Sequence, residues 1–87
     1  MIAIDKVDAT TFQVSVETDA TTHHTVTLKP DVFALLARGR ASEEALIKVA
    51  FEFLLEREPN TSIMGTFELQ VIGQYFPEFE AEIKRRL

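Results

Sequence analysis

The stretch THHTVTLKPDVFALLARGRASEEALIKVAFEFLLER, residues 22–57, contains the transition that decides the fold. In its first eight residues polar and apolar side chains alternate, which predicts a half-buried strand with Val26 and Leu28 facing inward. Pro30 then suits the first position of a helix, because its missing N–H needs no partner there. A short helix follows, and Gly39 predicts its left-handed end. The chain therefore changes from strand to helix at about residue 30.

The second helix of this stretch is expected to begin after Ser42, whose hydroxyl suits an N-cap, and to end before Pro59. Its polar side chains recur at every fourth position and form one narrow stripe: Glu44, Lys48, Glu52 and Glu56. The other residues between 45 and 55 are apolar, and a helix that is apolar around most of its circumference must be buried on most sides. The helix at 43–57 is therefore predicted to be the central element of the domain.

Upstream of this stretch, residues 10–18 also alternate polar and apolar side chains and predict a second strand. The link to residues 22–29 is short and polar, so the two strands are expected to pair as an antiparallel hairpin. Residues 2–4 are a candidate for a third strand. The N-terminal part is thus either a hairpin or a three-stranded meander.

Downstream, residues 63–64 are expected to begin a short helical or irregular piece, and a further helix is expected at about 68–76. Gly73 lies inside that helix at a cost of about 1 kcal/mol relative to Ala, which predicts a close approach by another group. Pro77 interrupts the pattern before a last helical segment at 78–87.

Together these elements predict an α+β fold in one small domain, residues 1–87. Its N-terminal hairpin or meander covers 1–29, and three or four helices around the central helix cover 30–87. A helix this apolar in a chain this short also suggests that a second copy completes the core, so we expect a homodimer.

Composition and charge restrict the classes of function. The chain of 87 residues has no cysteine, which excludes disulfides and thiolate metal sites and fits a cytoplasmic location. Its apolar runs are far shorter than the ~18 residues that a membrane span requires, and its start does not resemble a signal peptide. Fourteen acidic residues oppose nine basic ones, for a net charge of −5. Nucleic-acid-binding proteins usually carry a basic surface, so this balance argues against a nucleic-acid partner.

Residues with catalytic or ligating chemistry are few. His23 and His24 are adjacent on a predicted strand, where neighbouring side chains point to opposite faces and cannot chelate one ion together. Both are expected to be exposed hairpin residues, and Glu52 and Glu56 to form a solvated helix face. Tyr75 is expected to have a packing role. We therefore predict no metal site, no cofactor and no enzymatic activity.

Residues 23–57 resemble a ribbon-helix-helix DNA-binding protein in the order of their elements. The resemblance implies that Thr25, Thr27 and Lys29 read the major groove and that SEEALI clamps a phosphate. Three features of the chain differ from that family. The first helix is short, a preceding strand is expected to occupy the edge where two chains would pair, and Glu43 and Glu44 would repel the phosphate.

A second resemblance covers residues 42–83. This half is similar to a group of small uncharacterised bacterial proteins that share L-x-R-E-P, S-I, F-x-L-x-x-I and Y-F-P-E. In this chain the matching residues are Leu55, Arg57, Glu58, Pro59, Ser62, Ile63, Phe67, Leu69, Ile72 and Tyr75 to Glu78. The resemblance implies a relationship and no activity. We refer to these positions below as the C-terminal pattern.

From the sequence we predict a non-enzymatic binding module that associates with itself, docks one protein partner, or does both. The alternative is a ribbon-helix-helix-like DNA-binding regulator or antitoxin, which would use the three residues named for groove reading.

Overall fold

The computed structural model describes residues 1–87 as an α+β fold with a four-stranded sheet and four α-helices. The strands are β1 (Ile2–Lys6), β2 (Thr11–Glu17), β3 (Thr21–Thr27) and β4 (Thr66–Glu68). The α-helices are α1 (Pro30–Ala37), α2 (Glu43–Leu55), α3 (Ile72–Tyr75) and α4 (Phe79–Arg86), and two 3₁₀ turns are η1 (Asn60–Ser62) and η2 (Leu69–Val71). No helix has both the length and the apolar composition that crossing a bilayer requires.

The N-terminal part is the predicted antiparallel meander, with residues 2–6 forming its third strand. β1 pairs with β2 and β2 pairs with β3, and Phe12 lies opposite Val26 in the register. The side chain of Asp8 closes the first turn, because its Oδ1 accepts hydrogen bonds from the backbone N–H groups of Thr10 and Thr11. Alternation along β2 buries Phe12, Val14 and Val16 on one face of the sheet.

Residues 30–87, predicted as the helical part of the domain, also contain a strand, β4, which the sequence did not predict. This strand pairs with β3 in parallel, with Phe67 opposite Val26, so the sheet is mixed and its strand order is β1-β2-β3-β4. Residues 66–68 are extended because the pairing puts Phe67 on the inner face, where its ring lies 6.1 Å from that of Phe51. The helical segment predicted at 68–76 accordingly begins later, as η2 and α3.

Local signals set the limits of α1 and α2. Pro30 is the first residue of α1, and the helix ends in two consecutive left-handed residues, Arg38 with φ 51° and Gly39 with φ 73°. Ser42 caps α2, since its hydroxyl accepts a hydrogen bond from the backbone N–H of Ala45 at 3.1 Å. The structure confirms the predicted starts of both helices, whereas the C-cap of α1 is the left-handed Arg38, one residue before the predicted Gly39.

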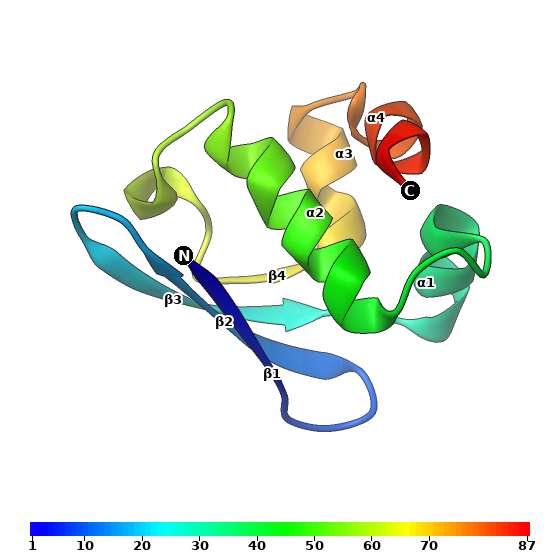
Figure 1. Cartoon of the computed structure of the whole chain (residues 1–87), viewed down its shortest axis with the longest axis horizontal. Helices are drawn as coiled ribbons and strands as arrows, with labels where there is room; N and C mark the ends of the chain where they lie inside the picture. The colour runs from blue at the N-terminus through cyan, green and yellow to red at the C-terminus, as the bar shows by residue number, and fades with distance from the viewer.

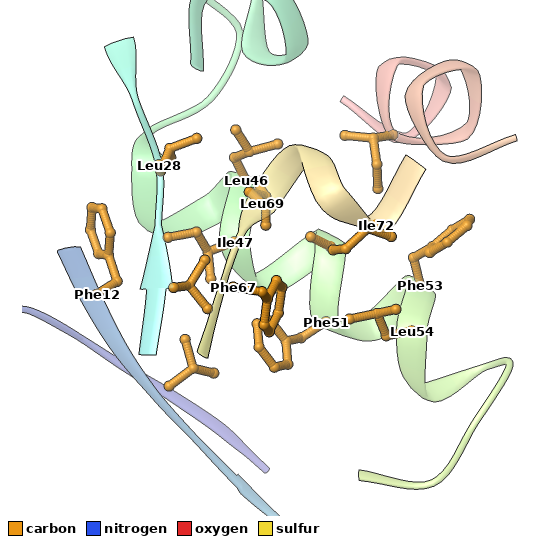
Figure 2. Close-up of a cluster of buried hydrophobic side chains, with 14 of the residues drawn as sticks. Phe12, Leu28, Leu46, Ile47, Phe51, Phe53, Leu54, Phe67, Leu69 and Ile72 are labelled. Atoms are coloured by element: carbon orange, nitrogen blue, oxygen red, sulfur yellow. The ribbon is translucent and has the colours of Figure 1, made fainter. Parts of the chain in front are cut away.

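All four α-helices lie on one side of the sheet, and α2 crosses that inner face as the central helix (Figure 1). The opposite face is uncovered and carries polar side chains such as Gln13, Glu17 and His23. On the covered side, α2 buries six residues among the sheet and the other helices: Leu46, Ile47, Ala50, Phe51, Phe53 and Leu54 (Figure 2). One chain therefore buries its own central helix, and the core does not need the second copy that its apolar composition suggested.

The helical end of the chain packs on α2 through aromatic side chains. The ring of Phe53 lies 5.3 Å from Phe79 at the start of α4 and 5.9 Å from Phe76, both edge to face. The predicted close approach at Gly73 is wrong, because a Cβ added there would meet no atom within 4 Å. Gly73 thus has no steric requirement in the fold.

Candidate functional site

The two histidines have different environments, and the prediction that both are exposed is wrong for His24. This residue is 2% exposed on the inner face of β3, whereas His23 lies on the open face beside the hydroxyl of Ser15 at 3.0 Å. The alternation that buries Val26 also buries the residue two positions before it. The polar character of His24 concealed this in the sequence.

His24 connects the sheet to the segment that precedes β4. Its Nδ1 lies 2.7 Å from the carbonyl oxygen of Met64, and a carbonyl can only accept, so Nδ1 carries the proton. Its Nε2 lies 2.9 Å from the hydroxyl of Thr22, and its ring packs 5.4 Å from that of Phe51. Both ring nitrogens have partners within the protein, so His24 has a structural position that fixes residue 64.

A second buried polar residue, Asn60, holds η1 against the β2–β3 hairpin. Its Nδ2 donates to the carbonyl oxygens of Val16 at 3.2 Å and Ala20 at 2.9 Å, and it lies 3.1 Å from the hydroxyl of Thr22. Thr22 thus contacts both buried polar side chains. Together, Asn60 and His24 anchor the two ends of the linker 60–64 to the sheet.

The carboxylates on the polar stripe of α2 do not form a shared site. Glu52 is exposed, and Glu56 pairs with Arg86 at 2.6 Å and with Arg57 at 3.4 Å. The hydrogen bond from Arg86 lowers the pKa of Glu56 below its ordinary value. No three His, Asp or Glu side chains lie close enough together to hold a metal ion.

The residues named for groove reading lie along the edge of the open face. Thr25 and Thr27 are half-buried there, and the hydroxyl of Thr25 accepts a hydrogen bond from the amide of Gln13. Lys29 pairs with Glu68 at 3.0 Å, and that hydrogen bond raises the pKa of Lys29. Because the part of β3 that contains Thr25 and Thr27 is paired with β2 on one side and β4 on the other, it has no free edge there for a two-chain ribbon.

A pocket of about 320 Å³ opens where the end of α2, residues 62–64 of the linker, β4 and α3 meet. We call it the C-terminal pocket. Its lining residues are Leu54, Glu58, Ser62, Ile63, Met64, Phe67, Ile72, Tyr75 and Phe76. Four of them are buried core side chains that form its floor: Leu54, Ile63, Phe67 and Ile72. Figure 2 shows Leu54, Phe67 and Ile72 among the buried side chains; they belong to α2, β4 and α3.

The rim of the pocket is partly exposed and chemically mixed. Met64 and Phe76 are half-buried, Ser62 is exposed, and Tyr75 is 65% exposed. The predicted packing role of Tyr75 is therefore wrong, because the residue is largely exposed to solvent. A large aromatic side chain in this position offers contact area and a hydroxyl to an incoming group.

Arg57 lies outside the pocket and packs against Phe76, one of its lining residues. Its guanidinium carbon lies 3.6 Å from the ring centroid of Phe53 and 6.0 Å from that of Phe76. The same group pairs with Glu78 at 3.2 Å and donates to the carbonyl oxygen of Phe53 at 3.1 Å. Its charge and hydrogen-bonding capacity are thus used within the protein.

Glu58 is the only charged residue in the lining. It is half-buried, and it takes part in none of the ion pairs that engage Glu43, Glu56, Glu68, Glu78, Glu80 and Glu82. The basic groups at this end of the molecule are occupied elsewhere: Arg57 as described, and Arg86 by Glu56 and Glu82. The pocket therefore combines an apolar floor with one carboxylate that has no cationic partner.

Seven of the nine lining residues belong to the C-terminal pattern: Glu58, Ser62, Ile63, Phe67, Ile72, Tyr75 and Phe76. The sequence resemblance marked these positions without indicating that they surround one cavity. These pattern positions could have indicated the pocket, but they lie in segments separated along the chain.

Comparison of the chain with protein-family models, with curated proteins and with solved structures finds no match. Both resemblances described above therefore stay predictions.

Proposed function

We propose that this protein is a non-enzymatic binding module that docks one protein partner through the C-terminal pocket. The observation that carries the proposal is an apolar pocket of about 320 Å³ that opens beside a 65% exposed tyrosine. Its volume is at the lower end of the ~300–1,000 Å³ typical of ligand sites. Partly exposed aromatic residues next to such pockets are typical anchors of protein interfaces.

The chemistry of the lining supports recognition rather than turnover. Its polar side chains are Glu58, Ser62 and Tyr75, and no hydrogen bond joins any two of them. A nucleophile in an acyl-transfer site would need a base within hydrogen-bonding reach. An apolar floor with a few polar groups at the rim instead resembles the core-and-rim organisation of binding interfaces.

A partner other than a second copy is favoured by three observations. The central helix α2 is already buried within one chain, and each copy carries a net charge of −5, which opposes self-association. The pocket is also lined by an acidic residue and no basic one, so two copies offer no opposite charges to each other there.

Selection from a displayed library of random 12-residue peptides tests the proposal. We expect the protein to select peptides that lose binding to Ser62→Trp, which places a large ring at the mouth, and to Tyr75→Ser. The matched control is Val7→Ser, which removes an exposed apolar side chain (58% exposed) in the β1–β2 turn and should retain binding.

Two outcomes would contradict the docking proposal. One is a library that yields no peptide sensitive to Ser62→Trp or Tyr75→Ser, while both variants keep the melting temperature of the wild type. The other is a dimer in sedimentation equilibrium that Tyr75→Ser dissociates and Val7→Ser does not, since a second copy would then occupy the pocket.

A further inference from the structure

We infer that the occupant of the C-terminal pocket is a peptide segment with one large apolar side chain next to a lysine or arginine that pairs with Glu58. This inference rests on the proposed docking function and specifies the chemistry of the partner. The observation behind it is that Glu58, a half-buried acidic residue without an ion-pair partner, is the one charged residue in a mostly apolar lining.

Glu58 would lose contact with water if an apolar group filled the pocket. An apolar group seated on Leu54, Ile63, Phe67 and Ile72 removes water from this wall. Burying an ionised carboxylate without a partner is unfavourable, so Glu58 would oppose an occupant that offers only apolar surface. A favourable occupant must therefore bring its own donor.

The donor that Glu58 needs is a cation supplied by the partner. The two arginines at this end of the molecule are already engaged, because Arg57 is held by Phe53 and Glu78, and Arg86 by Glu56 and Glu82. A charge-assisted hydrogen bond is roughly twice as strong as a neutral one. The net charge of −5 also attracts a cationic segment over longer distances.

The occupant is a segment of chain because the pocket opens to solvent. Five lining residues keep part of their surface in solvent: Glu58, Ser62, Met64, Tyr75 and Phe76. An inserted side chain can thus stay attached to a backbone that runs outside over the rim. The exposed face of Tyr75 lies where it can contact either the backbone or the basic neighbour of the anchor.

Charge exchange at Glu58 tests the inference with the same library of random 12-residue peptides. Against the wild type we expect enrichment of lysine or arginine within two positions of an aromatic or large aliphatic residue. Against Glu58→Lys the enrichment should change to aspartate or glutamate at the same spacing. A synthetic peptide from the wild-type selection should bind Glu58→Gln about ten- to hundredfold more weakly, as expected for loss of a hydrogen bond to a charged group.

The controls separate this inference from the docking proposal. Because the Glu58 side chain has no ion pair, both variants should keep the melting temperature of the wild type, and Glu52→Gln, on the exposed face of α2, should leave the selection unchanged. Peptides that depend on Ser62 and Tyr75 but show no basic preference, and bind Glu58→Lys equally well, would overturn the inference and leave the docking site. Failure to select any pocket-dependent peptide would overturn both.

Discussion

His24 and Asn60 are the two buried polar residues of the chain, and both serve the same segment. Their hydrogen bonds attach the linker 60–64 to β2, β3 and the turn between them. This linker carries Ser62, Ile63 and Met64, which form one side of the C-terminal pocket. The shape of the pocket thus depends on two polar side chains that do not line it.

Replacing His24 by leucine should reduce the free energy of unfolding by about 1–3 kcal/mol, because the carbonyl of Met64 loses its donor inside the protein. Chemical denaturation measures the change. His23→Leu is the matched control, since this neighbour lies on the open face of the sheet, and it should stay within about 0.5 kcal/mol of the wild type. Equal effects of the two substitutions would contradict the structural position of His24.

For single residues, the sequence predicted which side chains point inward better than it predicted their hydrogen-bond partners. Alternation along 22–29 places Val26 and Leu28 inward, as observed, and the same parity places His24 inward. The hydrogen bonds from His24 to Met64 and from Asn60 to Ala20 join residues 40 positions apart, so no local pattern could reveal them. His24 was therefore predicted to be exposed, and no local pattern indicated that Asn60 is buried.

Among the elements, α3 is short and contains a glycine with no steric purpose. Gly73→Ala should raise the free energy of unfolding by about 0.5–1 kcal/mol, because the added Cβ meets open space and the unfolded chain loses conformational freedom. Thermal or chemical denaturation measures this gain.

Gly39→Ala is the control for that substitution. It also adds a Cβ in open space, but at φ 73°, so it should lower stability by about 1–2 kcal/mol. If both substitutions changed stability in the same direction, the assignment of Gly73 to a helical conformation and of Gly39 to a left-handed one would be wrong.

Helix α4 carries an acid-sensitive ion-pair network. Hydrogen bonds from Arg85 and Arg86 lower the pKa of Glu82 from 4.5 to about 2. A carboxylate with a lowered folded-state pKa contributes stability that is fully present above pH 4.5 and is lost as the pH falls toward 2. The melting temperature of Glu82→Gln should thus lie below that of the wild type at neutral pH.

That difference should narrow as the pH is lowered from 4.5 to 2, where wild-type Glu82 becomes protonated as well. Melting curves across this range measure it, with Glu52→Gln as the control for loss of one exposed carboxylate outside any ion pair. A difference that stays constant down to pH 2 would show that the arginines do not stabilise the charged form of Glu82.

The elements with strong local signals were predictable, and β4 was not. Alternation identified β2 and β3, Pro30 and Ser42 identified the starts of α1 and α2, and the structure confirms each of them. β4 has only three residues, and it is a strand because it pairs in parallel with β3, about 40 residues earlier. Nothing in the sequence near Phe67 indicates that partner.

In the molecule as a whole, the candidate site could not be predicted from local sequence, as was the case for β4. The sequence predicted an α+β domain around α2, and the structure confirms that architecture (Figure 1). The C-terminal pocket is assembled from the end of α2, the linker, β4 and α3, so it exists only once β4 has joined the sheet. Its residues could be noticed in the C-terminal pattern, but their shared cavity depends on tertiary structure.

The central claim, that ligands dock in the C-terminal pocket, is tested most directly by methyl NMR during titration with a library-selected peptide. We predict shift changes at Leu54, Ile63, Met64 and Ile72, with the methyls of Ile2 and Ile4 on β1 unchanged, because β1 lies at the opposite edge of the sheet from β4. Shifts concentrated at β1, with the pocket methyls unchanged, would place binding elsewhere and contradict the account.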